Sequence, residues 1–421
     1  MADLLSESTR IIDSGIGDVP VNRVINELSE IADGLAIVES FSHSVVVDAG
    51  EGLVAFDASH AKTGGLVAAE IAKWSPTPVS HLVYTHGHAD HVGGSLDFEA
   101  AFGEMTVIGH RNVDERFDRY AYTNDWNVLI NARQFGGLRT DYGMAEGKGE
   151  FIPAGTLRPD HVVDDHETLH VGDHTIELHH ARGETDDHLW GWMPEQRWLF
   201  TGDFVIWNFP NAGNPQKVQR YPIEWAAALR EMAARGPELL LPAHGLPIEG
   251  RERIQMVLTD IAGALEFLVD EVVGMMNAGE VLDTIVHSVR VPDDVLAKPY
   301  LRPFYDEPEF VVRNIWRQFG GWWDGAPSRL KPAPDAVLAA EVAALAGGPS
   351  VLIGRAAELS ELGDHRLACH LADLAGWAAP HDAGVHAARA TVYRARRADE
   401  SSLMAKGIFA GAARESEAVA G

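Results

Sequence analysis

Short apolar runs alternate with turn-forming residues in the first part of the chain, which is the pattern of β-strands. The runs LAIVES (35–40), SVVVDAG (44–50) and GLVAFDA (52–58) are rich in β-branched residues and are broken by glycine and aspartate, as in successive hairpins. Between the third run and another one, HLVYTH (81–86), the apolar spacing from Val67 to Trp74 predicts a helix.

A second group of strands is predicted further along the chain. Its apolar runs are HTIELHHA (174–181), LWGWMP (189–194), RWLFTGD (197–203) and ELLLPAHG (238–245). The segment IEWAAALREMAARG (223–236) has the spacing of an amphipathic helix, which Gly236 would end. Two strand groups, each with helices, predict an α/β fold of the αββα type, in which two sheets pack face to face with helices outside.

From residue 251 onward the pattern changes from strands to helices. One long amphipathic helix is predicted to end at Gly279, and an aromatic, then proline-rich stretch (315–334) is typical of a connector between domains. Beyond it, alanine, leucine and glycine recur as in helix-turn-helix repeats, but about one and a half repeats are too few for a stable solenoid. We expect an αββα domain at 1–280 and an all-α domain at 281–421, whose apolar face packs on the core or on another subunit.

Composition and charge limit the classes of function that the chain can have. The 421 residues are 46% hydrophobic and 23% charged, which is typical of a globular protein of two domains. The net charge of −28 argues against nucleic-acid binding, although it is compatible with an anionic small substrate because a bound metal pair reverses the local field. Cys369 is the single cysteine, so neither an internal disulfide nor a cysteine-based metal site is expected.

The sequence also bears on location. Its N-terminal segment lacks the basic and apolar regions of a signal peptide, and it has no run of about 18 apolar residues that would span a membrane. A cytoplasmic protein is therefore expected.

The densest group of candidate metal ligands lies in YTHGHADHVGG (84–94). His86 and His88 are two positions apart where the chain leaves a strand, so their imidazoles can point the same way and bind one ion. Asp90 and His91 follow after the chain has turned and can bind a second ion. Two metal ions about 3.5–4 Å apart generate a nucleophile from water at neutral pH, so the cluster predicts a dinuclear metallohydrolase.

This motif resembles that of the metallo-β-lactamase superfamily, whose members have an αββα fold and a metal site at strand ends. The resemblance implies that Asp57 in VAFDAS orients the site, that Asp203 in FTGDF bridges both metals and that His244 in LPAHG is the last ligand. His188 stands where the superfamily often has a histidine beside the ligands.

One ligand position departs from the superfamily's commonest pattern, in which a histidine stands in a PGHT turn. Here the turn reads ARGETDDH, with Glu184 at that position. Alkylsulfatases, the zinc-dependent sulfate-ester hydrolases of the superfamily, carry glutamate there and a second carboxylate 19 positions later, where this chain has Asp203. Pro194 also falls where that family has a proline. Asp203 replaces the glutamate usual in alkylsulfatases, and the carboxylate of Glu184 should make the metal pair less electrophilic than a histidine would.

The resemblance implies two Zn²⁺ ions per chain. One would be bound by His86, His88 and Glu184, and the other by Asp90, His91 and His244, with Asp203 shared. Asp90 and Asp203 are the carboxylates to which we assign a catalytic role.

The segment after Asp203 holds the sulfate in alkylsulfatases. Asn211 matches a family asparagine, Gln216 or Lys217 stands where the family has an arginine, and Arg220 falls near another family arginine. Asn211, Lys217 and Arg220 are therefore the expected substrate-binding residues. Pro210 stands where the family usually has a histidine, so the anion pocket is altered and the general acid is unassigned.

The C-terminal part resembles the alkylsulfatase dimerisation domain. The segments RNIWRQFGGWWDGAPSRLKPAP, ELGDHRLACHLADLAGWAAPHDAGVHAARA and KGIFAGAARE carry this resemblance, which implies a homodimer. Full-length alkylsulfatases also carry a sterol-carrier-like domain, and this sequence stops before one.

The leading hypothesis is a zinc hydrolase that cleaves small alkyl or aryl sulfate esters into an alcohol and sulfate. The alternative is a hydrolase with the same metal site that cleaves a lactone, a thioester or a phosphoester. A silent scaffold that binds a partner through its helical domain is a third interpretation, which a complete ligand set opposes.

Overall fold

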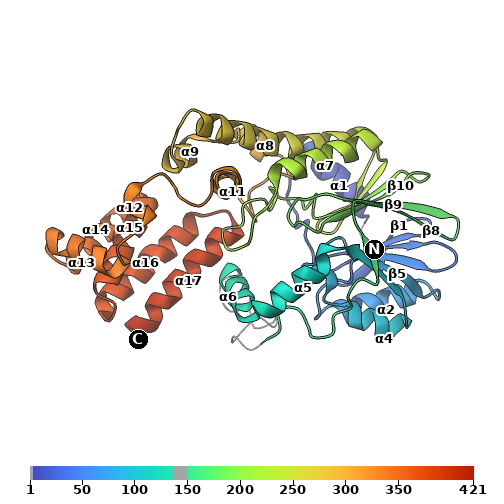
Figure 1. Cartoon of the computed structure of the whole chain (residues 1–421), viewed down its shortest axis with the longest axis horizontal. Coiled ribbons are helices and arrows are strands. Elements are labelled where there is room, and N and C mark those ends of the chain that lie inside the picture. The colour runs from blue at the N-terminus through green and yellow to red at the C-terminus, as the bar shows by residue number, and fades with distance from the viewer. Residues whose placement is uncertain (1–2, 136–148) are drawn as a thin grey trace. The chain divides into compact units, whose positions relative to one another are not determined.

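The structure, a computed structural model, describes residues 3–135 and 149–421 and divides into two compact units (Figure 1). The first unit comprises Met1–Asn127, Glu150–Glu280 and Thr284–Gly321, and the second comprises Val128–Gly149, Val281–Asp283 and Trp322–Gly421. The segment from Thr284 to Gly321 therefore packs with the first unit, although the sequence pattern placed it after the expected boundary at residue 280.

Seven strands form the first sheet of the first unit, in the order β1-β2-β3-β4-β5-β6-β7. β1 to β4 are antiparallel neighbours, whereas β4 to β7 run parallel. The strands are β1 (Glu27–Ala32), β2 (Leu35–Glu39), β3 (Ser44–Asp48), β4 (Leu53–Phe56), β5 (Val79–Val83), β6 (Thr106–His110) and β7 (His161–Val163).

Six strands form the second sheet, in the order β13-β12-β11-β10-β9-β8. All its neighbours are antiparallel except β11 and β12, which run parallel. The strands are β8 (His166–Val171), β9 (His174–His180), β10 (Leu189–Met193), β11 (Trp198–Gly202), β12 (Leu239–Pro242) and β13 (Ile248–Glu249).

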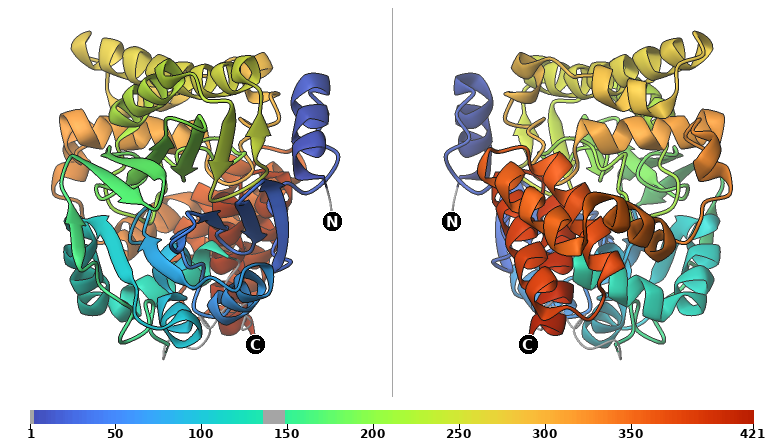
Figure 2. Two further views of the ribbon diagram at one scale, coloured as in Figure 1. Left: turned by 90° about the vertical axis from the view of Figure 1, so that its right-hand side faces the viewer. Right: turned by 90° about the vertical axis from the view of Figure 1, so that its left-hand side faces the viewer.

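Helices cover the outer faces of the two sheets (Figures 1 and 2). α2, α4 and α5 pack on the first sheet, while α7 lies against the long helix α8 on the side of the second. The helices of this unit are α1 (Leu4–Ser14), α2 (Gly64–Trp74), α3 (Ala89–Val92), α4 (Ser95–Phe102), α5 (Asn112–Tyr122), α7 (Pro222–Arg235), α8 (Arg251–Asn277), α10 (Asp293–Leu296) and α11 (Pro308–Gly320). Two more helices, α6 (Asn124–Gln134) and α9 (Leu282–Ser288), each have residues in both units. The predicted αββα architecture is confirmed.

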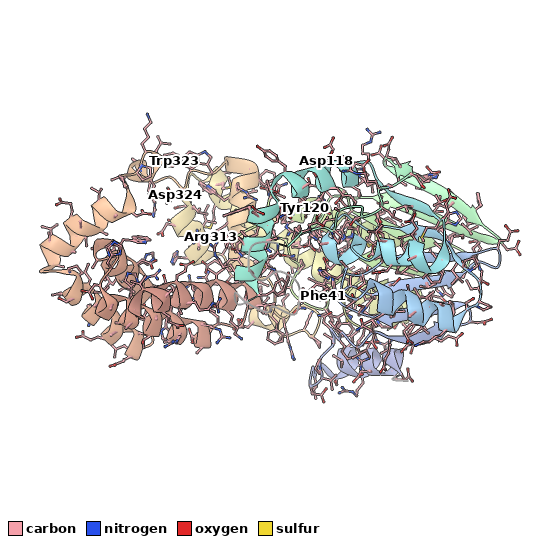
Figure 3. All side chains as sticks on the ribbon, turned by 90° about the horizontal axis from the view of Figure 1, so that it is seen from below. Phe41, Asp118, Tyr120, Arg313, Trp323 and Asp324 are labelled. Atoms are coloured by element: carbon pink, nitrogen blue, oxygen red, sulfur yellow. The ribbon has the colours of Figure 1, made fainter. Side chains whose placement is uncertain are left out.

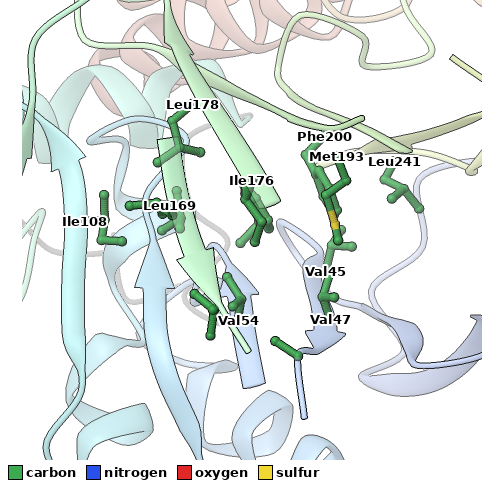
Figure 4. Close-up of a cluster of buried hydrophobic side chains, with 14 of the residues drawn as sticks. Val45, Val47, Val54, Ile108, Leu169, Ile176, Leu178, Met193, Phe200 and Leu241 are labelled. Carbon is green, nitrogen blue, oxygen red and sulfur yellow. The ribbon is translucent and has the colours of Figure 1, made fainter. Parts of the chain in front are cut away.

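The alternation of side chains along β3 and β4 explains why these strands are apolar throughout. Val45 and Val47 point into the core between the sheets, whereas Val46 points toward the helices. Figure 4 shows Val45, Val47 and Val54 facing side chains of the second sheet. Phe56 stacks on Phe200 across this core, with 4.1 Å between ring centroids. A strand covered on both faces reads as a continuous apolar run, as these strands do.

The second unit contains a helical bundle with an alanine-rich core. Its helices are α12 (Pro327–Leu330), α13 (Asp335–Ala346), α14 (Pro349–Glu361), α15 (His365–Ala378), α16 (Ala383–Asp399) and α17 (Leu403–Ala420). Side chains of Asp364, Asp382 and Ser402 accept backbone N–H bonds at the starts of α15, α16 and α17, which fixes where these helices begin. Before α12, the Asp324 side chain, labelled in Figure 3, accepts the N–H of Ala326.

The thiol of Cys369 belongs to the core of this bundle, and burial raises its pKa to about 11. Such a thiol is a poor nucleophile, so Cys369 serves as a packing residue. Over residues 3–135 and 149–421, no single helix is long and apolar enough to cross a membrane. α13 and α14 meet that test only as a pair, and 86° separates their directions.

Candidate metal centre

The expected metal ligands lie in loops at the carboxyl ends of strands. The run HLVYTH is strand only as far as Val83, and the loop after β5 carries His86 and His88. Glu184 follows β9, Asp203 follows β11 and His244 follows β12. Because the two sheets pack face to face, these loops meet at one edge of the sandwich and bring the ligands together.

Four of these residues form one group of donors. One donor atom from each of His86, His88, Glu184 and Asp203 lies within 4.8 Å of the others. The distance from His86 Nε2 to His88 Nδ1 is 2.8 Å, and that from His88 Nδ1 to Glu184 Oε1 is 3.7 Å. Asp203 Oδ2 lies 3.9 Å from His86 Nε2.

Asp90, His91 and His244 form a second group. Asp90 Oδ2 lies 3.6 Å from His91 Nε2 and 3.4 Å from His244 Nε2. The other oxygen of Asp203, Oδ1, lies 3.5 Å from each of these two imidazole nitrogens. Asp203 thus presents one oxygen to each group, which is the placement that a bridging ligand needs.

The donor atoms fit a metal pair. His91 Nε2, Glu184 Oε2 and Asp203 Oδ1 are buried and have no hydrogen-bond partner among the residues that the structure describes. Buried polar atoms without a partner are rare because they cost free energy, and a bound cation would satisfy all three. Imidazole nitrogens together with carboxylate oxygens suit zinc and similar borderline ions.

The ionisable groups of the site shift one another's pKa values. Burial opposes ionisation of Asp203, but the imidazoles of His244 and His91 outweigh it and hold the pKa of Asp203 well below its usual range. In turn, Asp203, Asp57 and Asp90 overcome the burial of His91 and raise its pKa well above the usual value. A metal ion would replace the protons on these imidazoles, so metal binding should weaken as the pH falls.

Asp57 orients His91 as the motif predicted. Its Oδ2 accepts a hydrogen bond of 2.7 Å from His91 Nδ1, and its two oxygens accept bonds of 2.7 and 2.8 Å from the backbone N–H and hydroxyl of Thr85. With Nδ1 donating to Asp57, Nε2 of His91 is left to face Asp90 and Asp203.

His188 is not among the grouped donors but contacts two of them, Asp203 and His86, whose ring centroid lies 4.6 Å from its own. It accepts a hydrogen bond of 3.2 Å from the backbone N–H of Asp203, and its ring stacks on Phe204 at 4.3 Å. Gly202 has a φ of 51°, and a Cβ there would lie 2.5 Å from His188 Nε2, so only glycine allows this approach to Asp203.

Sequence reasoning missed a buried ion pair behind the two histidines of the first group. Asp187 Oδ2 accepts a bond of 3.0 Å from the N–H of Gly87 and one of 2.7 Å from Arg116 Nε. The pair therefore fixes the peptide between His86 and His88. Asp187 was visible next to Glu184 in ARGETDDH, but Arg116 comes from α5, and no local signal links it to the motif.

His43 was also missed, and it secures the loop of His244. Its backbone N–H donates to Ala243 O at 2.8 Å, and its Nε2 donates to Gly245 O at 2.8 Å. Burial lowers the pKa of His43 to about 3, so the ring stays neutral and keeps this pattern.

Two of the three expected substrate-binding residues contact Glu184. Arg220 Nη1 lies 2.7 Å from Glu184 Oε1, and Asn211 Nδ2 donates a hydrogen bond to the same oxygen. Their binding of substrate stays a prediction.

Lys217, the third, interacts electrostatically with Glu184 and Asp90 of the donor groups. The Lys217 Nζ lies 5.4 Å from the ring centroid of Phe151, and Phe151 packs edge-on against Tyr120 of α5. Figure 3 labels Tyr120. Burial and Arg220 lower the pKa of Lys217 to about 7, while Glu184 and Asp90 act against this shift.

The loop that carries these residues is secured by the segment before and within α11. Gly213 N donates to Asp306 Oδ2 at 2.6 Å, and Asn314 Nδ2 donates to the carbonyl oxygens of Ala212 and Arg220, both at 2.9 Å. Next to Asp306, Tyr305 is a further residue that sequence reasoning missed. Burial and then Glu184 and Asp90 raise its pKa, so the phenol stays protonated near these carboxylates.

A third group of donors lies on the outer face of the second sheet, at His166, Glu177 and His179. There Arg235 Nη1 lies 2.7 Å from Glu177 Oε2, and its Nη2 donates to His179 Nε2 at 3.3 Å. The guanidinium already supplies the positive charge, so we assign no metal to this group.

Comparisons with known proteins agree with the architecture. Residues 37–244 match the family described as Metallo-beta-lactamase superfamily, and residues 281–418 match Alkyl sulfatase dimerisation. A linear primary-alkylsulfatase of Pseudomonas sp. (strain ATCC 19151) is 27% identical over 348 residues, which cover 79% of this chain and 65% of that protein. The alkyl/aryl-sulfatase BDS1 of Saccharomyces cerevisiae is 24% identical over 313 residues, which cover 69% of this chain and 47% of that protein.

Among solved structures, the stereoselective inverting sec-alkylsulfatase Pisa1 from Pseudomonas sp. matches with a TM-score of 0.82 at 20% identity. The match covers 93% of this chain and 66% of that chain, and it shows that the fold is shared. The chain thus spans less than two thirds of the length of each of these relatives.

Substitution of Asp57 tests the geometry of the second donor group. Asp57→Ala removes the acceptor that orients His91, so the zinc affinity should fall by about 10- to 100-fold. Competition with a chromophoric chelator measures this affinity. Asp33→Ala, at an exposed position, is the matched control and should leave it unchanged. An Asp57→Ala protein that binds zinc as tightly as the control would contradict the role of Asp57.

Proposed function

From a chain that carries a metallo-β-lactamase domain followed by an alkyl sulfatase dimerisation domain, we propose a metal-dependent hydrolase of sulfate esters. The reaction adds water to an alkyl or aryl sulfate and yields an alcohol and sulfate. The observation that carries the proposal is the donor set itself. Glu184 stands where most of the superfamily has histidine, and Asp203 presents one oxygen to each donor group.

We propose that the site holds two zinc ions, one at each donor group. When bound, such a pair acts as a Lewis acid that binds the anionic ester and activates water. The chain's own contribution is to hold the ligands in place. Asp57 orients His91, His188 holds the backbone of Asp203, and Asp187 with Arg116 fixes the peptide between His86 and His88.

Lys217 is the cation that we assign to the sulfate group. Arg220 is engaged by Glu184, whereas Lys217 interacts with Glu184 and Asp90 without an ion pair closer than 4.0 Å among the described residues. A sulfate ester carries a negative charge, which would favour the charged form of Lys217. Burial, with Glu184 and Asp90, raises the pKa of Tyr305, so its phenol keeps its proton in these surroundings.

The alternative is hydrolysis of another ester on the same site. It is favoured by one observation, which is that Pro210 replaces the histidine usual in the sulfate-binding segment of alkylsulfatases. Carboxyl esters, thioesters and phosphoesters are therefore included in the assay below.

We also propose that the chain forms a homodimer through its helical unit. Apart from Asp335 and Glu341, α13 consists of apolar residues, and its Val337, Leu338 and Leu345 are 56%, 53% and 88% exposed. A helix with so much apolar surface is normally buried, which supports a second copy as its cover.

Light scattering tests this assembly, with an expected mass of about twice the 45.8 kDa of one chain. Leu345→Asp should shift the protein toward the single-chain mass because it places a charge in the interface. Leu66→Asp, at an exposed position of α2, is the control. A single-chain mass for the unmodified protein at micromolar concentration would contradict the dimer.

Sulfate release tests the proposed reaction. Zinc-loaded protein should release sulfate from alkyl or aryl sulfates, measured by ion chromatography, and His88→Ala should abolish this release because it removes a metal ligand. His170→Ala, at an exposed histidine, should retain activity. Turnover of thioesters, lactones or phosphoesters without any sulfate release would overturn the assignment in favour of the alternative.

Replacement of Lys217 tests the anion pocket. Lys217→Ala should raise KM for a sulfate ester by about tenfold or more, because a charge-assisted hydrogen bond to the substrate is lost. Lys217→Arg should retain most of the affinity, and Lys73→Ala, at an exposed lysine, serves as the control. An unchanged KM in Lys217→Ala would exclude this residue from the sulfate site.

A further inference from the structure

We propose that Arg220 is a positioning residue that supplies the counter-charge for Glu184, so that the two together act as one neutral ligand in place of a histidine. This inference rests on the proposed metal site. Arg220 was expected to bind the sulfate group, whereas the structure places it against Glu184, an expected metal ligand.

The first argument is the geometry at one oxygen of Glu184. Arg220 Nη1 lies 2.7 Å from Oε1 and donates a second bond of 2.6 Å to the backbone carbonyl of Glu184 itself. Asn211 Nδ2 donates to the same Oε1. The side chains of Arg220 and Glu184 are 3% and 4% exposed, so this contact is shielded from water.

The second argument is the state of the other oxygen. Glu184 Oε2 is buried and has no hydrogen-bond partner among the described residues. Arg220 and Asn211 thus hold Oε1, which also lies 3.7 Å from His88 Nδ1, and they leave Oε2 without a hydrogen bond. A carboxylate held at one oxygen in this way has a fixed orientation, as a metal-binding imidazole has when its second nitrogen is hydrogen-bonded.

The third argument is the way in which Arg220 itself is held. Asn314 Nδ2 of α11 donates to the backbone carbonyl of Arg220 at 2.9 Å, and the same nitrogen donates to Ala212 O. The loop is therefore attached to α11 on both sides of the anion segment. This attachment holds the backbone of Arg220 in place beside Glu184, which a lasting ion pair between the two residues requires.

Charge decides how the pair acts on a metal. Glu184 replaces a neutral imidazole and so adds one negative charge, which the guanidinium of Arg220 cancels at close range. If Glu184 became neutral while Arg220 remained, an unpaired cation would stand beside the metal and repel it. Removal of Arg220 from such a protein should then improve metal binding, a direction that loss of a merely structural arginine would not produce.

The experiment is a double-mutant cycle read out as zinc affinity by chelator competition, without any assay of turnover. Glu184→His should weaken zinc binding by about tenfold or more, because Arg220 is left unpaired. The double variant Glu184→His with Arg220→Gln should recover to within about threefold of the unmodified protein. Glu184→His with Arg220→Lys should stay weak, because the positive charge remains.

Controls separate charge from folding. Arg230→Gln, which breaks a surface ion pair with Glu266, should not change zinc affinity in either background. Thermal unfolding of each variant verifies that it is folded, and Glu184→Gln replaces Glu184→His in the same cycle if histidine disturbs the loop.

A double variant that binds zinc no better than Glu184→His would overturn the inference and leave the sulfatase proposal standing. An unmodified protein that binds no zinc would overturn both.

Discussion

The whole site depends on the position of one carboxylate, Asp203. Its two oxygens reach the two donor groups, at 3.9 Å from His86 and 3.5 Å from His91 and His244. This placement follows from the fold, because β11 runs parallel to β12 and the two strands deliver Asp203 and His244 to the same edge. Gly202 makes the approach possible, since a side chain there would collide with His188.

Much of this arrangement could be predicted from the sequence, because it depends on patterns of residues that are close together in the chain. The spacing of His86, His88, Asp90 and His91 is contained in one short loop, and strand ends are recognisable from apolar runs. Glu184 lies far from this loop in the chain, and only the resemblance to a family joined it to the site. The sequence could show which residues carry donor atoms, but the distances between them come from the packing of two sheets.

The residues that support the ligands could not be predicted, for a physical reason. Arg116 lies on α5 and Tyr305 lies between α10 and α11, and each reaches the site only because an element distant in sequence packs against the sandwich. Asp306 and Asn314 secure the anion loop although the family match that contains them begins at residue 281 and describes dimerisation. A boundary drawn where one family match ends and another begins therefore separates the loop from the residues that hold it.

The pattern of buried charge shows where cations are still needed. Asp187 has Arg116 within hydrogen-bonding distance, Glu184 has Arg220, and Asp57 has His91. Among the described residues, Asp90 and Asp203 have no arginine or lysine within 4.0 Å, and the basic groups within that distance are imidazoles of the donor groups. Buried carboxylates are stable only when they are paired, hydrogen-bonded or bound to metal. The net charge of −28 thus gives no guide to the local field, and Asp90 and Asp203, which lack an arginine or lysine partner, both belong to the donor groups.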